Sequence, residues 1–95
     1  MEVKFKLEYY YLVLEEDISK ISVKNKIIIK KAIEEKLQFY PEVFGKPLRR
    51  SLKNYRSLRV GDYRVIFRIE KKVVKIFLIK HRSVVYENNF VARSE

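Results

Sequence analysis

Arginine is concentrated in the second half of this 95-residue chain, close to its single histidine. All eight arginines lie within residues 49–95, and the pair His81-Arg82 is soon followed by Tyr86. A guanidinium group donates forked hydrogen bonds that match two oxygens of a phosphate. Histidine is the side chain whose ordinary pKa lies near neutrality, and tyrosine can stack on a base or transfer a proton. These residue types indicate phosphate chemistry, with Arg64 and Arg82 as candidates for charge stabilisation.

The placement of charge supports this interpretation. The net charge is +10, yet residues 1–48 carry nine lysines against eight acids, whereas residues 49–95 carry thirteen basic residues against four acids. A merely solvated surface more often mixes lysine with glutamate, as the first half does. An arginine-rich half predicts a nucleic-acid or acidic-protein partner.

Three antiparallel strands are predicted to position these residues. Two runs rich in Val, Ile and Phe, residues 63–69 and 73–79, follow two short breaks, Gly61-Asp62 and Lys71-Lys72, that have the length of tight hairpin turns. If each break is a two-residue loop, Arg59 lies opposite Arg64 and Arg64 lies opposite Ile79. His81 then shares a face with Arg64.

Alternation of side chains sorts the predicted sheet into two faces. One face is nearly all apolar and requires a helical layer: Arg56, Leu58, Val60, Tyr63, Val65, Phe67, Ile69, Val74, Ile76 and Leu78. The other is basic, partly aromatic and expected to be wet: Tyr55, Ser57, Arg59, Arg64, Ile66, Arg68, Lys75, Phe77, Ile79 and His81. Arginine on an open face can serve solvation and prevent aggregation. The alternative is that a bound anion offsets the repulsion between Arg59 and Arg64.

The remaining elements are predicted to precede this sheet. Alternation from Val3 indicates a strand that ends near residues 9–11, and a short helix follows with Leu14, Ile18 and Ile21 as its apolar positions. Ser22 is the expected N-cap of a longer helix over residues 23–39, which buries Ile29, Ala32, Ile33 and Leu37 and is ended by Pro41. Residues 40–47 are expected to form a loop.

The fold class is therefore α+β, in one domain covering residues 1–95. The order is β-α-α-β-β-β, with two helices on one face of a mostly antiparallel four-stranded sheet and room for a short C-terminal helix.

Several kinds of site are excluded by composition. Without cysteine there is neither a disulfide nor a thiolate, and the acids Asp62, Glu70, Glu87 and Glu95 lack the spacing of metal ligands. We expect no cofactor. The apolar run near the N-terminus spans six residues, which is too short for a signal sequence or a membrane span, so a soluble cytoplasmic protein is expected.

The strings GKPLRRSLKNYRSLRVGDYRVIFRI and IKHRSVVY, at residues 45–69 and 79–86, resemble the signature of the RelE/ParE toxin superfamily, in particular its RelE-like branch. The resemblance extends over essentially the whole chain, including EEDISKIS at residues 15–22. It implies a small toxin of a type II toxin–antitoxin system, an mRNA interferase that cuts mRNA in the ribosomal A site. It also implies neutralisation by a cognate antitoxin.

The resemblance also assigns residues. Arg64, Arg82 and Tyr86 fall on positions that hold functional arginines and a tyrosine in RelE-like nucleases. A lysine pair that some members carry is not reproduced, because Tyr55 and Ser57 stand roughly there. The general base is thereby left unassigned. The expected RNA- or ribosome-binding residues are Lys53, Arg56, Arg59, Arg68, Lys75 and Lys80.

Metal-free RNA cleavage by the 2′-hydroxyl needs a proton acceptor, positive charge around the phosphorane and an acid for the departing 5′-oxygen. Arg64 and Arg82 are expected to supply charge, and Tyr86 and His81 are the candidates for proton transfer. Each has a structural alternative, since His81 could be an ordinary surface residue and Tyr86 could close the core.

Two other functions stay open. The chain could be a non-catalytic ParE-like toxin that inhibits gyrase, or a basic RNA-binding module without toxicity. The expected partners are mRNA, the ribosome and an antitoxin with an acidic or amphipathic segment, with operator DNA bound only through the antitoxin complex. No membrane partner is expected.

Overall fold

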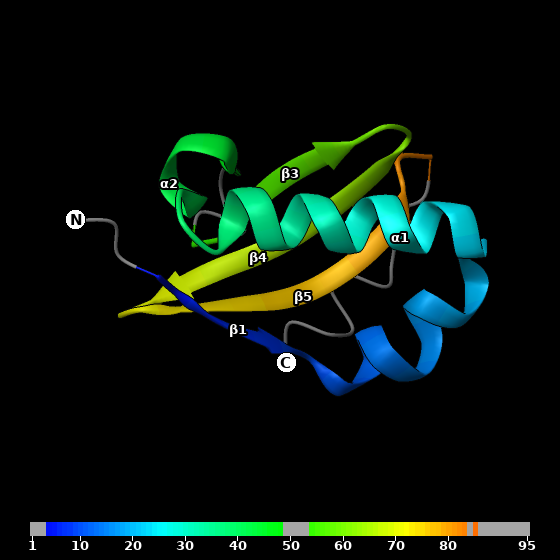
Figure 1. Ribbon diagram of the computed structural model, residues 1–95, viewed down its shortest axis with the longest axis horizontal. Coiled ribbons are helices and arrows are strands. Elements are labelled where there is room, and N and C mark those ends of the chain that lie inside the picture. The colour runs from blue at the N-terminus through cyan, green and yellow to red at the C-terminus, as the bar shows by residue number, and fades with distance from the viewer. Residues whose placement is uncertain (1–3, 49–53, 84, 86–95) are drawn as a thin grey trace.

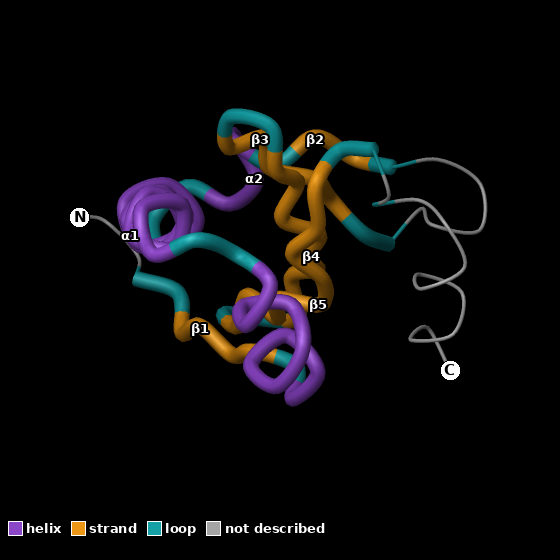
Figure 2. Tube along the Cα trace, turned by 90° about the vertical axis from the view of Figure 1, so that its right-hand side faces the viewer, coloured by secondary structure: helices purple, strands orange, loops and turns teal. Residues whose placement is uncertain are grey.

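The computed structural model describes residues 4–48, 54–83 and 85. A five-stranded sheet has the order β1-β5-β4-β3-β2, and its helices lie against one face (Figures 1 and 2). The strands are β1 (Lys6–Tyr9), β2 (Lys46–Pro47), β3 (Arg56–Val60), β4 (Tyr63–Glu70) and β5 (Val73–His81). Strand β1 runs parallel to β5, and the other neighbours are antiparallel. The predicted α+β fold and its element order are confirmed.

Both predicted hairpin turns are present. Val60 lies opposite Tyr63 and Arg59 opposite Arg64, so Gly61 and Asp62 form the first loop. Glu70 lies opposite Val73 across the second loop, Lys71-Lys72. Gly61 has a φ of 59°, a conformation that glycine adopts without steric cost.

A β-bulge changes the register in the second half of β5. Ile66 pairs with Leu78 whereas Phe67 pairs with Ile76, so Phe77 is an extra residue in β5. Every later residue is displaced by one position, which exchanges its face. Arg64 therefore lies opposite Lys80, and the predicted pairing of Arg64 with Ile79 was wrong. The predicted faces of Leu78, Ile79 and His81 are reversed for the same reason.

The long helix begins where the sequence predicted. Ser22 accepts a hydrogen bond from the Asn25 N–H at 3.2 Å, and α1 (Val23–Ala32) continues into a π-helical turn, η3 (Ile33–Leu37). No helix in the described part of the chain has the length and apolar character needed to span a membrane.

The expected loop at residues 40–47 contains two short elements. Pro41 begins the one-turn helix α2 (Pro41–Phe44), because proline is compatible with a first helical turn. Lys46 and Pro47 then form β2, which adds a fifth strand to the predicted four. Pro47 is tolerated there because β2 is at the edge of the sheet.

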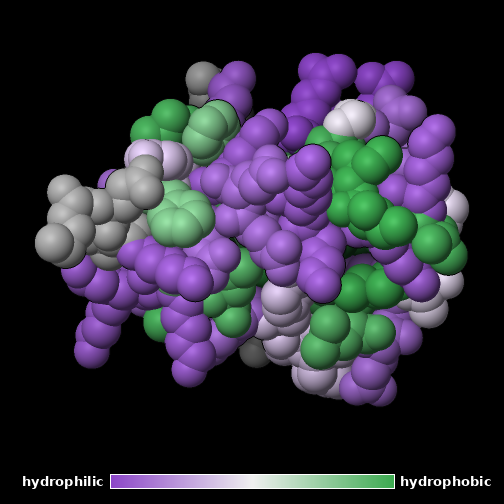
Figure 3. Space-filling view, viewed as in Figure 1, coloured by the Kyte–Doolittle hydropathy of each residue, from purple (hydrophilic) through white to green (hydrophobic). Residues whose placement is uncertain are grey.

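The main core lies between the helices and the sheet. It buries apolar residues of both layers: Val13, Ile21, Ile29, Ile33, Leu37, Leu58, Val65, Phe67, Val74, Ile76 and Ile79. Leu14, predicted as an apolar position of the short helix, is 56% exposed. The reason is that η1 (Val13–Asp17) is a π-helical turn followed by the 3₁₀ turn η2 (Ile18–Lys20), so the buried positions are Val13, Asp17 and Ile21. Leu14 instead lines an apolar hollow beside α1 (Figure 3).

The second face of the sheet also holds a hydrophobic cluster. Ile66, Phe77, Leu78 and Val85 are buried there, and Tyr10, Leu48 and Tyr55 pack against them. The prediction that this face is wet was therefore wrong for its centre. The bulge places both Phe77 and Leu78 in the cluster, and Val85 covers them. The charged residues of this face lie towards the ends of the strands, on either side of the cluster.

Candidate functional site

Two arginines face each other beside the Gly61-Asp62 turn. Arg59 on β3 is exposed, and Arg64 on β4 is half-buried. The Arg64 guanidinium donates a hydrogen bond to the Tyr63 carbonyl oxygen at 3.4 Å. Among the described residues, no carboxylate forms an ion pair with either guanidinium within 4.0 Å. The repulsion between these cations is therefore open to compensation by an anion from solution.

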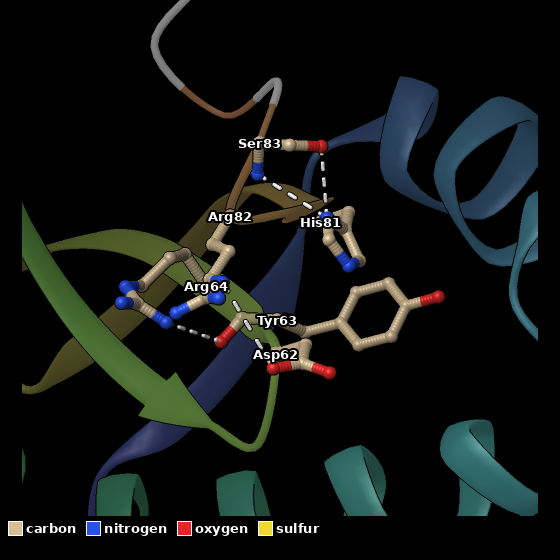
Figure 4. Close-up of polar contacts among 6 residues, drawn as sticks. All are labelled: Asp62, Tyr63, Arg64, His81, Arg82 and Ser83. Atoms are coloured by element: carbon tan, nitrogen blue, oxygen red, sulfur yellow. Dashed lines mark hydrogen bonds and ion pairs between the residues drawn. The ribbon is translucent and has the colours of Figure 1, made fainter.

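Arg82 adds a third guanidinium at the same turn. Its backbone N–H donates to the Asp62 carbonyl oxygen at 2.8 Å, which fixes the chain just beyond β5 against the turn. Its Nε lies 4.0 Å from Asp62 Oδ1, and both side chains are more than half exposed. An exposed ion pair of this length contributes little. Arg64 and Arg82 point to one side of the turn in Figure 4.

His81 is placed on the other side of the turn. Its ring meets the Tyr63 ring edge to face, with centroids 5.6 Å apart, and both rings point away from the arginine side chains (Figure 4). The Ser83 N–H donates to His81 Nδ1 at 3.2 Å, so in the neutral ring the proton is on Nε2. The bulge in β5 causes this placement, and the prediction that His81 shares the Arg64 face was wrong.

Arg56 supports the fold on the helix-covered side of the sheet. It lies opposite Phe67, a core residue, and donates to the carbonyl oxygen of Gly45 at 2.9 Å. A longer contact of 3.4 Å joins it to the Glu42 carbonyl oxygen. Arg56 therefore anchors the connection from α2 to β2 and does not join the group at the Gly61 turn.

Arg68 and Lys75 share a carboxylate at the opposite end of the sheet. Glu70 accepts from Arg68 at 2.9 Å and from Lys75 at 2.9 Å, through separate oxygens. The Arg68 guanidinium also lies over the Tyr55 ring, 5.9 Å from its centroid. Both predicted binding cations are thus engaged within the chain, and Glu70 offsets part of their charge.

This group predicts a loss of stability in acid. A hydrogen bond from Lys75, followed by the charge of Arg68, holds the pKa of Glu70 below its ordinary value of 4.5. A lowered folded-state pKa gives stability that is present above the unfolded value and is lost as pH falls through the folded value. Urea unfolding of wild type and Glu70→Gln from pH 7 downward should show their stabilities converging below pH 4.5. A constant difference over that range would contradict the prediction.

Lys80 is paired with a buried carboxylate, that of Asp17 in η1. Its Nζ lies 3.0 Å from Asp17 Oδ1, with the Lys80 side chain 12% and the Asp17 side chain 0% exposed. The other Asp17 oxygen accepts from the Ile79 N–H at 2.9 Å. A signal for this burial was present, since Asp17 is four residues from both Val13 and Ile21.

Two predicted site residues, Lys53 and Tyr86, lie outside the described residues. Among the described residues, no group of three histidines or carboxylates could hold a metal ion. The site that the structure assembles therefore consists of Arg59, Arg64 and Arg82. Its chemistry is the binding of an anion, and guanidinium geometry suits a phosphate.

Comparison with known proteins matches this chain to toxins. Residues 14–86 match the family model of the ParE toxin of the type II toxin–antitoxin system, parDE. No curated protein matches the chain.

Three solved structures share the fold. The RelBE2 toxin–antitoxin complex from Mycobacterium tuberculosis has a chain 28% identical with a TM-score of 0.79, covering 85% of this chain and 94% of that one. YafQ from E. coli is 22% identical with a TM-score of 0.53, over 87% and 99% of the two chains. The E. coli DinJ-YafQ toxin–antitoxin complex has a chain that is 17% identical with a TM-score of 0.55, covering 88% of this chain and 99% of that one.

Proposed function

The chain belongs to the family of ParE toxins of type II toxin–antitoxin systems, and we propose that it acts as an endoribonuclease that cuts mRNA in the ribosomal A site. The toxin role follows from the family, and the ribosome-dependent cleavage is our inference. Its support is the site described above together with the RelE-like signature at residues 45–69 and 79–86.

The observation that carries the proposal is the convergence of Arg59, Arg64 and Arg82. Strands β3 and β4 bring two of them together, and the Asp62 carbonyl oxygen holds the third in place. Asp17 compensates Lys80, and Glu70 compensates Arg68 and Lys75. Among the described residues, the three guanidinium groups at the Gly61 turn have one carboxylate contact, the long exposed contact of Arg82 with Asp62. Three arginines that no carboxylate compensates closely therefore gather at the Gly61 turn.

The proposed reaction uses the RNA's own 2′-hydroxyl as nucleophile. Its oxygen attacks the adjacent phosphorus and its proton passes to a base, while the bond to the 5′-oxygen breaks and that oxygen receives a proton. The products are a 2′,3′-cyclic phosphate and a 5′-hydroxyl. Arg64 and Arg82 stabilise the negative charge of the phosphorane. We propose Tyr86 for proton transfer. His81 is the second candidate, but its ring lies on the other side of the turn from Arg64 and Arg82 and would have to turn towards the phosphate to take part.

A cognate antitoxin is the proposed protein partner. The RelBE2 and DinJ-YafQ structures are toxin–antitoxin complexes, and a chain of net charge +10 favours a partner with an acidic or amphipathic segment. Such a segment would cover the three arginines and prevent RNA from binding. Operator DNA would be bound through that complex, and the site of action on ribosomes is cytoplasmic.

A second candidate function is favoured by the family model itself. The match is to ParE toxins, and the superfamily includes toxins that inhibit gyrase without catalysis. In that case the arginines would form a binding surface. A basic RNA-binding module is the third alternative, and it requires neither cleavage nor gyrase binding.

Primer extension on a defined mRNA in programmed 70S ribosomes tests the proposal, with a supercoiling assay for gyrase run on the same protein. We expect cuts in the A-site codon that require the ribosome and no effect on supercoiling. Inhibited supercoiling without cuts would establish the ParE-like alternative instead. Salt-sensitive RNA binding without either activity would leave the RNA-binding module.

A further inference from the structure

Asp17 occupies the place that a neighbouring strand leaves vacant beside β5. Strand β1 ends at Tyr9, opposite Ile76, and the Tyr10 N–H still donates to the Ile76 carbonyl oxygen at 2.8 Å. The chain then turns into η1, and the Asp17 carboxylate accepts from the Ile79 N–H at 2.9 Å. The carboxylate thus satisfies a backbone group near the end of β5 that would otherwise lack a partner strand on that side.

The Asp17 carboxylate also fixes the position of Lys80, one of three cations that lie in a row across the sheet. Arg59, Arg64 and Lys80 lie opposite one another on β3, β4 and β5, so all three belong to one face. The Lys80 ammonium group is drawn to Asp17 Oδ1 at 3.0 Å and is largely buried. Arg59, in contrast, stays exposed.

From this arrangement we propose that Asp17 is a positioning residue that withdraws Lys80 from the cationic face, so that a phosphate at this face meets Arg59, Arg64 and Arg82 but not Lys80. The inference rests on the proposed binding of RNA at this face. It replaces the expectation that Lys80 contacts RNA, and it assigns a role to a residue outside the arginine group.

Because Asp17 is buried, a phosphate does not readily take Lys80 away from it. A phosphate that attracted Lys80 outward would break an ion pair with a fully buried carboxylate, and separating a buried ion pair is strongly unfavourable. The exposed Arg82–Asp62 contact has no such penalty because water solvates both groups. Phosphate therefore competes readily for Arg82 and poorly for Lys80.

The salt dependence of RNA binding distinguishes these cations, because its slope counts the phosphates that the protein neutralises. We would titrate the full chain with a short single-stranded oligouridine at several KCl concentrations, where each neutralised phosphate contributes about 0.7 to the slope of log K against log salt. Arg64→Ala should reduce the slope by about that amount. Lys80→Met should leave it unchanged, and Asp17→Asn should increase it by about 0.7, because Lys80 becomes available.

The double variant Asp17→Asn/Lys80→Met should return the slope to the wild-type value, which a purely structural role for Asp17 does not predict. Circular dichroism of each variant verifies folding. Lys80→Met removes the cation from the buried Asp17 carboxylate, so if it does not fold, the slope of Asp17→Asn is compared with that of the double variant, which should be lower by about 0.7. A lower slope in Lys80→Met would overturn the inference even where Arg64→Ala supports RNA binding. If wild type binds no RNA, or Arg64→Ala leaves the slope unchanged, the proposed RNA site itself is wrong and the inference with it.

Discussion

Replacing Arg64 with alanine is expected to slow mRNA cleavage by about 100-fold, the loss typical when one preorganised charge-stabilising donor is removed. Arg64 is half-buried at the start of β4, so its guanidinium is held by the sheet rather than by a flexible loop. Arg64→Lys keeps the charge but loses the forked geometry, and we expect it to recover only part of the rate. Single-turnover cleavage of a defined mRNA on programmed ribosomes measures both variants.

Lys31→Ala is a control for the removal of one positive charge. Lys31 lies on the exposed side of α1 and makes only a long surface contact with Glu35, at 4.0 Å. Its loss should leave the rate within about twofold of wild type, as expected for an exposed charge far from the reaction. Thermal unfolding should show Arg64→Ala to be as stable as wild type, because the mutation also removes the repulsion from Arg59. Cleavage by folded Arg64→Ala at the wild-type rate would exclude this residue from the reaction.

Gly45→Ala is expected to lower the free energy of unfolding by about 3 kcal/mol, at the upper end for overpacking a core. A Cβ at Gly45 would collide with the Phe67 ring and lie 2.9 Å from the Pro41 carbonyl oxygen. Neither group can retreat easily, since Phe67 is fully buried and the oxygen belongs to the backbone of α2. The carbonyl of Gly45 also accepts the 2.9 Å hydrogen bond from Arg56, so displacement would disturb that contact too. Urea unfolding measures the change.

Gly61 provides the matched comparison, because glycine is needed there for its backbone conformation and not because a side chain would lack space. A Cβ there would meet no atom within 4 Å, but its φ of 59° disfavours most side chains. Gly61→Ala should cost about 1 kcal/mol, and Gly61→Asn less, since asparagine tolerates this conformation. If Gly45→Ala proved no more destabilising than Gly61→Ala, the close packing of Gly45 on Phe67 would be in question.

Local signals in the sequence determined much of the sheet and the helices. Gly61-Asp62 and Lys71-Lys72 marked both turns because a two-residue loop sets which residues lie opposite each other, as Arg59 and Arg64 do. Ser22 marked the start of α1 because its hydroxyl accepts from a nearby N–H. Arginine placement indicated the anion-binding group, since Arg59 and Arg64 are separated by a single turn.

Only the tertiary structure decided which cations and which titratable side chains face the same way. The bulge at Phe77 turned His81 towards Tyr63 and put Lys80 opposite Arg64. A shift of one residue exchanges the faces of all later residues, but the order of residue types in β5 does not reveal that the shift occurs. Asp17 and Lys80 are sixty-three positions apart, so their pairing depends on η1 packing beside the end of β5. Local sequence patterns cannot reveal such a contact, because a buried ion pair forms only when two distant segments pack together and exclude water from both charges.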